Sequence, residues 1–181
     1  PEHTASTVVA QHGRHDPACV SIHIIQGRAV GNLNHILLHC HGLLDHLETA
    51  IELVPDRFRQ GQARLLVCGK PIRAHASLGK SGDLLGEALR EELARRRQPH
   101  VVPPLAELDL GREESIVACL DRTMPCAVVN AAAFTDVARA ELPEHRDEVM
   151  RVNRDGPGWL AAACARQGLP LVQVSTDYVF D

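Results

Sequence analysis

The chain lacks the sequence features that mark several large classes of protein. Basic residues are not in excess, since the 181 residues carry a formal net charge of −4. A surface rich in Lys and Arg is the usual electrostatic signature of binding to nucleic acid or to an anionic membrane. Apolar runs are also short, well below the roughly 18–20 residues that a transmembrane helix requires. We therefore expect neither nucleic acid nor a membrane among the partners.

Cysteine is present, but without the spacing of a disulfide framework or a metal-binding motif. The six cysteines lie at positions 19, 40, 68, 119, 126 and 164, and none of them forms a C-x-x-C pair. Four fall inside apolar or helical segments, where reduced cysteine behaves as a small hydrophobic residue. We therefore expect free thiols and a cytoplasmic location, where disulfides are rare.

The two ends of the chain lack the marks of a complete gene product. The first residues, Pro1 to His3, are polar, and no apolar segment of a signal peptide follows them. An initiator Met is absent, and the chain ends at Asp181 soon after a strand-like apolar run. We expect this sequence to be a piece of a longer protein.

Composition divides the chain near residue 60. Eight of the 11 histidines fall within residues 1–46. Residues 1–32 show no hydrophobic period and no core-forming run, so we expect them to be irregular and loosely attached. Residues 33–53 carry apolar side chains at helical spacing and predict a helix that ends before Pro55. We assign residues 1–63 to an N-terminal extension of unknown role and residues 64–181 to a separate domain.

A histidine cluster in the first half invites a metal-binding interpretation. His35 and His39 are four residues apart, a spacing that places two imidazoles on one face of a helix. His41 and His46 are close in sequence but do not continue that spacing, and no C-x-x-C or carboxylate motif accompanies them. Zinc sites usually show tighter ligand spacing, so the sequence favours solvated or partly packed histidines, and we assign no metal site.

Beyond residue 63, apolar strands alternate with amphipathic helices. Continuous apolar strands joined by helices indicate a parallel sheet that is covered on both faces. The fold class is therefore α/β, a Rossmann-like doubly wound parallel sheet that is truncated, with an irregular or helical N-terminal extension. The sequence predicts strands over 64–68, 100–102, 127–132 and 169–174, and helices over 83–97, 112–121 and 148–167.

Two glycine-containing segments compete for the role of a phosphate-binding turn. Gly69 directly follows the first of these strands, whereas the segment 79–86 (GKSGDLLG) opens the next helix, and Pro71–Leu78 is inserted between them. Backbone N–H groups at a helix N-terminus suit a pyrophosphate. The glycines alone are equally compatible with a surface loop, but their place between a strand and an amphipathic helix favours a dinucleotide turn.

Four segments of the second half carry specific motifs: 79–89 (GKSGDLLGEAL), 107–110 (ELDL), 128–135 (VVNAAAFT), and 152–160 (VNRDGPGWL) leading to 175–181 (STDYVFD). Together they resemble the extended short-chain dehydrogenase/reductases, and most specifically the dTDP-4-dehydrorhamnose reductase family. The resemblance covers about residues 64–181, and residues 1–63 match nothing in that family. It implies NAD(P)H-dependent reduction of a nucleotide-linked 4-keto sugar in dTDP-L-rhamnose biosynthesis, with NADPH or NADH as cofactor and a nucleotide sugar as substrate.

The resemblance also implies roles for individual residues. Thr176 is the catalytic hydroxyl, which hydrogen-bonds the reacting oxygen of the substrate, and Asp177 contacts the substrate beside it. The alternative interpretation of Ser175-Thr176-Asp177, a helix N-cap or a turn, is the less favoured one. The implied cofactor-binding residues are Gly79, Gly82, Asp83 and Leu84 at the pyrophosphate, Asp109 and Leu110 at the adenine, and Ala133, Phe134 and Thr135 beside the nicotinamide.

The proton-donating pair of the family, Tyr-x-x-x-Lys, is expected some twenty-odd residues after Thr176, beyond Asp181. Since general acid catalysis is typically worth about 10²–10⁴-fold, we expect residues 1–181 alone to be an inactive fragment. The inserted segment Pro71–Leu78 leads us to expect weak or absent NAD(P) binding by these residues. The full-length protein is a possible homodimer. The alternative function is a non-catalytic regulatory subunit, similar to the β-subunit of methionine adenosyltransferase.

Overall fold

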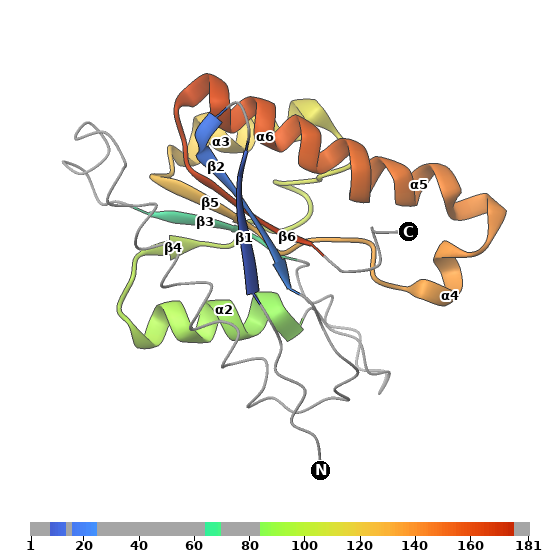
Figure 1. Cartoon of the computed structure of the whole chain (residues 1–181), viewed down its shortest axis with the longest axis horizontal. Helices are drawn as coiled ribbons and strands as arrows, with labels where there is room; N and C mark the ends of the chain where they lie inside the picture. The colour runs from blue at the N-terminus through green and yellow to red at the C-terminus, as the bar shows by residue number, and fades with distance from the viewer. Residues whose placement is uncertain (1–7, 14–15, 25–63, 70–83, 176–181) are drawn as a thin grey trace, which may run out of the picture.

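A six-stranded sheet forms the centre of the molecule in this computed structural model, which describes residues 8–13, 16–24, 64–69 and 84–175 (Figure 1). The strands lie side by side in the order β1-β2-β6-β5-β3-β4. Apart from β1 and β2, neighbours in this order are far apart in sequence, so the sheet is held together by crossovers. The strand bounds are β1 Val8–Gly13, β2 Asp16–Ile24, β3 Leu65–Cys68, β4 His100–Val101, β5 Ala127–Asn130 and β6 Leu171–Ser175.

The strands of the second half are all parallel. Strand β3 pairs with both β4 and β5, and β5 pairs with β6. Every residue of β3 and of β5 is buried, which explains why their sequences, LLVC and AVVN, show no polar alternation. A strand covered on both faces needs apolar side chains on both. The predicted parallel α/β sheet is therefore confirmed, with strand bounds within three residues of those expected.

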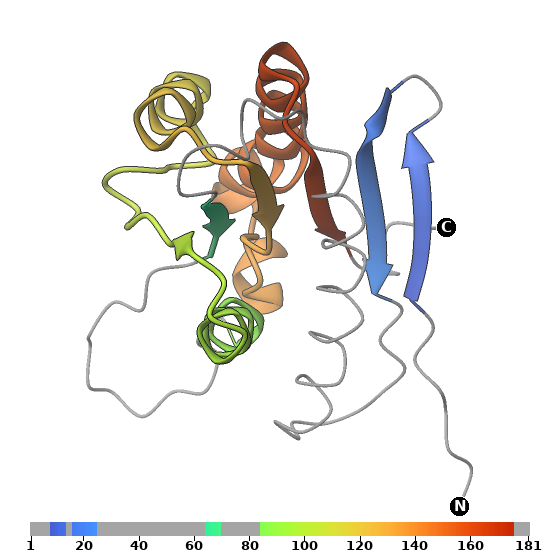
Figure 2. The same cartoon turned by 90° about the vertical axis from the view of Figure 1, so that its left-hand side faces the viewer.

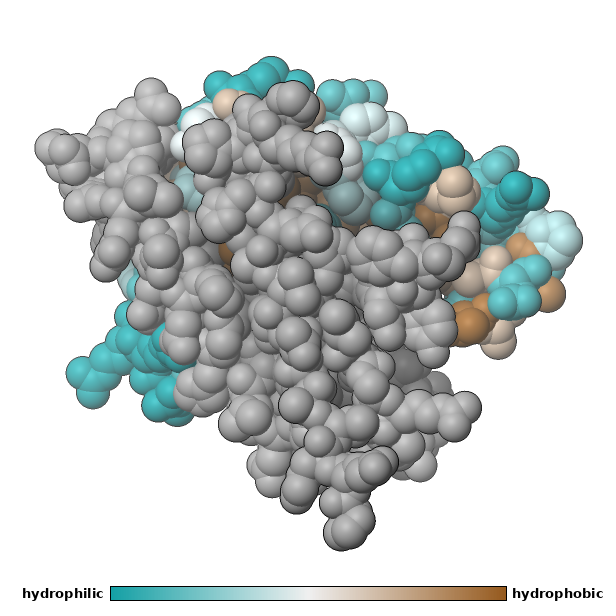
Figure 3. All heavy atoms as spheres, in the orientation of Figure 1, coloured by the Kyte–Doolittle hydropathy of each residue, from teal (hydrophilic) through white to brown (hydrophobic). Residues whose placement is uncertain are grey.

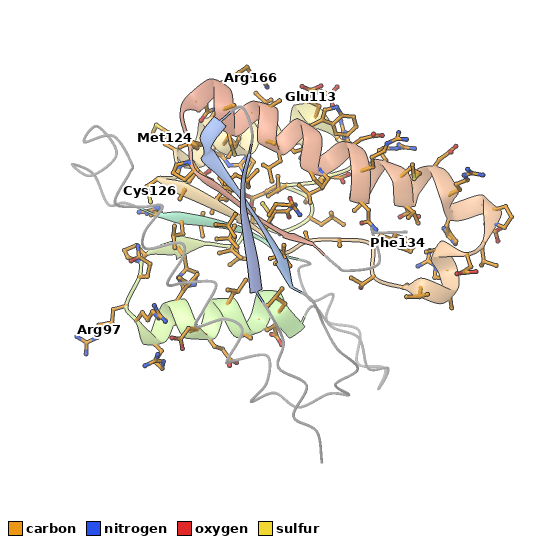
Figure 4. All side chains as sticks on the ribbon, viewed as in Figure 1. Arg97, Glu113, Met124, Cys126, Phe134 and Arg166 are labelled. Atoms are coloured by element: carbon orange, nitrogen blue, oxygen red, sulfur yellow. The ribbon has the colours of Figure 1, made fainter. Side chains whose placement is uncertain are left out.

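Helices cover both faces of this sheet. Helix α2 (Leu84–Arg95) lies on one face, and α3 (Glu113–Thr123) and α6 (Gly156–Gln167) lie on the other (Figure 2). The main hydrophobic core fills the space under α3 and α6 and includes Leu66, Ile116 and Leu160. Glu113 at the start of α3 and Arg166 in the last turn of α6 form an ion pair of 3.9 Å over this layer (Figure 4).

The helix predicted over 148–167 is a composite of several pieces. A short arm, made of α4 (Val137–Ala140), η2 (Pro143–His145) and α5 (Arg146–Met150), leads into the π-helical segment η3 (Arg151–Asp155) and then into α6. The backbone N–H of Gly156 donates to the carbonyl of Arg151, five residues back. Pro157 has no N–H to donate to the carbonyl four residues back, so the ordinary α-helical ladder is interrupted at this point.

Helix α2, on the face of the sheet opposite to α3 and α6, carries a buried carboxylate. Glu92 of α2 is almost fully buried, and its carboxylate accepts hydrogen bonds from Arg95 Nε at 2.7 Å and from Arg96 Nε at 2.8 Å. Arg95 lies one turn further along the helix. The hydrogen bond that Arg95 donates to Glu92 raises the pKa of the Arg95 guanidinium. Two charged donors offset the cost of removing the carboxylate from water.

The expectation of irregular structure over residues 1–32 is wrong for Val8–Gly13 and Asp16–Ile24. These residues form an antiparallel hairpin, β1 and β2, and β2 pairs in parallel with β6. A pairing strand satisfies N–H and C=O groups that would otherwise be open along the edge of β6. The sequence carried a signal that we did not use, because Val20, Ile22 and Ile24 alternate with polar residues, the period of a strand.

The position of the hairpin is informative. In the doubly wound strand order 3-2-1-4-5-6, the observed order β4-β3-β5-β6 corresponds to strands 2-1-4-5. Strand β2 therefore occupies the place that strand 6 takes in that order. The hairpin shares a sheet with the second half, and the division of the chain at residue 63 stays a prediction. The helix expected over 33–53 and the histidine cluster lie outside the described residues.

We predict that removal of the hairpin opens the edge of β6. Deletion of residues 1–24 should accelerate amide exchange about fivefold or more at those β6 amides that do not bond to β5, since one net hydrogen bond is worth about 1 kcal/mol. Deletion of residues 1–13 removes only β1 and should leave β6 protected. Equal protection of β6 in both truncated chains, followed by NMR, would show that β2 does not pair there.

The described cysteines are buried. Cys68, Cys119 and Cys126 are free thiols and, like Cys164, have almost no exposed surface. Burial raises the pKa of Cys68, Cys119 and Cys126, and the neighbouring thiols of Cys164 and Cys119 add to the shift at Cys68. Reactivity requires the thiolate, so these thiols should be inert in the folded protein. The expectation that cysteine acts here as a small hydrophobic residue is confirmed.

This inertness can be measured in a variant without the other two cysteines, Cys19→Ser/Cys40→Ser. We expect DTNB to label almost no thiol in native buffer at pH 8, and all four remaining thiols in denaturant. Rapid labelling of even one thiol under native conditions would contradict the packing of the core described above.

Candidate functional site

The candidate site lies where the parallel strands end. From β3 the chain passes through α2 to β4 on one side, and from β5 it passes through the arm and α6 to β6 on the other side. The order therefore reverses between β3 and β5. Open α/β sheets bind ligands outside the carboxyl ends of the strands at such a switch point. The ends of β3 and β5 are joined there by a hydrogen bond of 2.9 Å from the Ala131 N–H to the Cys68 carbonyl.

A buried amide joins the ends of β5 and β6. Asn130, the last residue of β5, is fully buried. Its Nδ2 donates to Gln173 Oε1 at 2.8 Å, and its Oδ1 accepts from the Ala132 N–H at 3.1 Å. Gln173 Nε2 donates in turn to the Val174 carbonyl at 2.7 Å. Asn130 therefore fixes the end of β6, and the start of the loop after β5, relative to one another.

The loop after β5 carries the residues predicted beside the nicotinamide. Ala133 and Phe134 are half-buried, and Thr135 is exposed. The ring of Phe134 faces the arm, with its centroid 5.7 Å from the Arg139 guanidinium carbon and 6.2 Å from the His145 ring centroid (Figure 4). The Phe134 backbone is held separately, since its N–H donates to Asn153 Oδ1 at 2.7 Å and its carbonyl accepts from Asn153 Nδ2 at 3.0 Å.

The arm beside this loop exposes apolar side chains. Val137 of α4, Leu142 before η2 and Met150 of α5 are all substantially exposed. Figure 3 shows apolar surface among hydrophilic residues over α4 and the turn that follows it.

The turn predicted at the adenine follows β4. One carboxylate oxygen of Asp109 accepts from the Gly111 N–H at 2.9 Å, and the Asp109 N–H donates to Ser115 Oγ at 2.9 Å. These two bonds shape a tight turn before α3. Leu110 lies between them and is buried in the main core, so its side chain secures the turn, and a ligand at this point would meet its backbone.

Both of these loops contact the segment 151–156. Asn153 bonds the backbone of Phe134, as described above. A Cβ atom added to Gly156 would lie only 2.6 Å from the Leu110 carbonyl oxygen, so the start of α6 presses against the turn at 109–111. Sequence analysis had assigned Asn153 and Gly156 no role, although both lie within the segment VNRDGPGWL that carries the resemblance.

Of the remaining predicted site residues, only Leu84 belongs to the described part of the chain. Gly79, Gly82, Asp83, Thr176 and Asp177 lie outside the described residues, as does the inserted segment 71–78. Leu84 opens α2, consistent with its predicted place at a helix start. Within the described ranges no three metal-binding side chains come together, and no helix has the length and apolar character needed to cross a membrane.

The strand order and the helices on both faces define a doubly wound α/β fold, and the candidate site lies at its switch point. The sequence matches the family model described as the RmlD substrate binding domain over residues 76–181, more than half of the chain. The chain belongs to this family, and the resemblance found from its motifs is confirmed.

Relatives with assigned activities are considerably longer. The dTDP-4-dehydrorhamnose reductase of Aggregatibacter actinomycetemcomitans is 33% identical over 120 residues, which are 66% of this chain and 36% of that protein. A dTDP-4-dehydrorhamnose reductase structure from Clostridium acetobutylicum matches with a TM-score of 0.52 at 29% identity, covering 65% of this chain and 38% of the other. The Bacillus anthracis enzyme, solved in complex with NADP, also has a TM-score of 0.52, at 26% identity over 65% and 37%. The chain spans about a third of the length of the curated relatives it matches.

Asn130 offers a direct test of the site's framework. We predict that Asn130→Leu lowers the free energy of unfolding by about 1–3 kcal/mol, because the Ala132 N–H and the Gln173 amide lose a buried partner. Gln167→Leu is the matched control: it removes an amide that donates to Asp121 at 2.8 Å on the exposed surface, and should cost less than about 0.5 kcal/mol. Equal urea midpoints for the two variants would contradict the role given to Asn130.

Proposed function

We propose that the protein carrying this chain is an NAD(P)H-dependent reductase of a nucleotide-linked 4-keto sugar, similar to the dTDP-4-dehydrorhamnose reductases. One observation supports this most directly. The family match over residues 76–181 includes both loops at the switch point and the strand that leads to Ser175-Thr176-Asp177. The match and the position of the loops in the fold therefore point to the same edge of the sheet.

The residues at this edge fit a dinucleotide. Asp109 keeps a half-buried carboxylate, and one of its oxygens is bound to the Gly111 N–H, which leaves lone pairs to accept from an adenine amine or a ribose hydroxyl. Ala131 to Ala133 carry small side chains beside the end of β5, so a flat ring can approach the backbone there. When bound, the cofactor supplies the hydride. Asp109 and Leu110 would hold its adenine end, and Ala133, Phe134 and Thr135 its nicotinamide end.

The pyrophosphate would be held by Gly79, Gly82, Asp83 and Leu84. Helix α2 begins at Leu84, so the backbone N–H groups of its first turn are the natural partners of an anion. Neither an acidic residue for a ribose 2′-hydroxyl nor an arginine for a 2′-phosphate directly follows β4, where the sequence is Val102-Pro103-Pro104. The proposal therefore includes both NADPH and NADH.

Thr176 and Asp177 would act on the nucleotide-sugar substrate. The Thr176 hydroxyl would donate to the ketone oxygen, orient it and polarise the carbonyl, while Asp177 would accept from a neighbouring sugar hydroxyl. A threonine hydroxyl of ordinary acidity is a poor proton donor, so the alkoxide needs a stronger acid. The 181 residues contain a single tyrosine, Tyr178, and no Tyr-x-x-x-Lys pair. The proposed acid is therefore contributed by a part of the protein outside these residues.

We predict that Thr176→Val lowers kcat of the protein that carries this chain by about 10²-fold or more, because the hydroxyl acts on the developing alkoxide.

Asp109→Asn should raise KM for NADPH while changing kcat little, since its carboxylate meets only the far end of the cofactor. Both are measured by NADPH oxidation with dTDP-4-dehydro-6-deoxy-L-mannose. Asp121→Asn, on the surface of α3, is the control and should keep both constants.

Residues 1–181 alone should show no turnover and bind NADPH more weakly than micromolar by calorimetry. Turnover by these residues that Thr176→Val abolishes would show that the proton donor lies within them. If the longer protein binds nucleotide without reducing the keto sugar, the reductase proposal is wrong, and a regulatory role beside a partner enzyme becomes the better account.

A further inference from the structure

Two loops are assigned above to opposite ends of the cofactor. Within the described residues, no hydrogen bond joins these two loops directly. The turn at 109–111 follows β4, and the loop at 131–136 follows β5. What they share is the segment 151–156, which lies between the arm and α6. In Figure 1, α5 and α6 run as one long rod across the layer of helices that contains α3.

The contact of this segment with the 131–136 loop is a reciprocal pair of hydrogen bonds. The Asn153 amide donates to the Phe134 carbonyl and accepts from the Phe134 N–H, at 3.0 and 2.7 Å. A single side chain thus pairs with both backbone groups of one residue, as a neighbouring strand would. Only asparagine or glutamine carries a donor and an acceptor in this arrangement. This contact therefore sets both the distance and the orientation of the Phe134 backbone.

The contact of this segment with the 109–111 turn is a close approach of Gly156, which has no side chain. Gly156 is buried, and an added Cβ would lie 2.6 Å from the Leu110 carbonyl oxygen and 3.2 Å from Leu110 Cβ. On the other side of the turn, a Cβ at Gly111 would meet Val152 Cγ2 at 3.8 Å. Asn153 and Gly156 are three positions apart, and the π-helical turn between Arg151 and Asp155 widens the helix there.

We infer that the segment 151–156 is a strut that fixes the spacing between the 109–111 turn and the 131–136 loop, with Asn153 and Gly156 as its two contact points. Both are positioning residues: neither touches the reacting atoms in the proposed mechanism. The inference rests on the proposed function only for the purpose of the strut, which is to hold the two ends of a dinucleotide at the right separation. The mechanical coupling between the loops is independent of any ligand.

Amide exchange by NMR without nucleotide tests the coupling in the 181-residue chain. Asn153→Ala should accelerate exchange of the Phe134 amide about tenfold, for the loss of a net bond worth about 1.4 kcal/mol. If the strut is rigid, exchange at Gly111 also increases. Asn153→Asp keeps the acceptor but loses the donor and should give an intermediate result. Arg154→Ala removes only a surface pair with Asp155 and should change neither loop.

A second pair of variants perturbs the other contact point. Gly156→Ala should displace the Leu110 turn and accelerate exchange in both loops, whereas Gly158→Ala, whose added Cβ meets nothing within 4 Å, should leave both loops unchanged. Both substitutions place a better helix former in α6, so helix propensity is matched between them. Acceleration at one loop alone, in Asn153→Ala and in Gly156→Ala, would overturn the coupling.

The purpose of the strut is tested in the reductase that carries this chain. Asn153→Ala should raise KM for NADPH about tenfold and leave kcat nearly unchanged, since only the seating of the cofactor is loosened. A fall in kcat at constant KM would overturn the positioning role. If the loops are coupled by exchange but no reductase activity exists even in the unmodified protein, the strut stands and the proposed function fails.

Discussion

The buried pairing of β3 with β5 is the constraint on which the rest of the structure depends. All residues of both strands are buried, so each strand is apolar on two faces except at Asn130, and each must satisfy its backbone within the sheet. That requirement places helices on both faces and brings the loop after β5 to the end of β3. The reversal of strand order between them then opens the place where a ligand can enter. The Asn130 bridge to β6 extends the same framework by one strand.

Most of this framework could be predicted from the sequence, because its signal is local and repeated. The runs LLVC and AVVN are too apolar for an exposed strand, and leucines at helical spacing mark α2. The π-helical turn at 151–155 could not be predicted in the same way. It depends on a missing donor at Pro157 together with the close approach of Gly156 to Leu110, a contact between residues 46 positions apart in sequence. Periodicity carries no information on such a contact.

The site shows the same division between local and distant information. Motifs pointed to Asp109, Ala133 and Phe134, and the structure places them in two loops after β4 and β5, the parallel strands on either side of β3. Their support was not visible in sequence: the Asn130 amide, the Asn153 bonds to the Phe134 backbone, and the burial of Leu110 all join segments that are distant in the chain. The N-terminal hairpin was missed for another reason. Its alternating valine and isoleucines were present, but the alternation is short, and residues 1–32 as a whole show no sustained hydrophobic period.

The central claim is that a dinucleotide binds at the carboxyl edge between β3 and β5. The most direct measurement is NMR of the isotope-labelled chain with NADP⁺ added to millimolar concentration, at which even weak binding shifts amide resonances. Our account predicts shift changes at residues 109–111 and 131–136, at one edge of the sheet. Changes confined to the opposite edge, or to the exposed surfaces of α3 and α6, would contradict it.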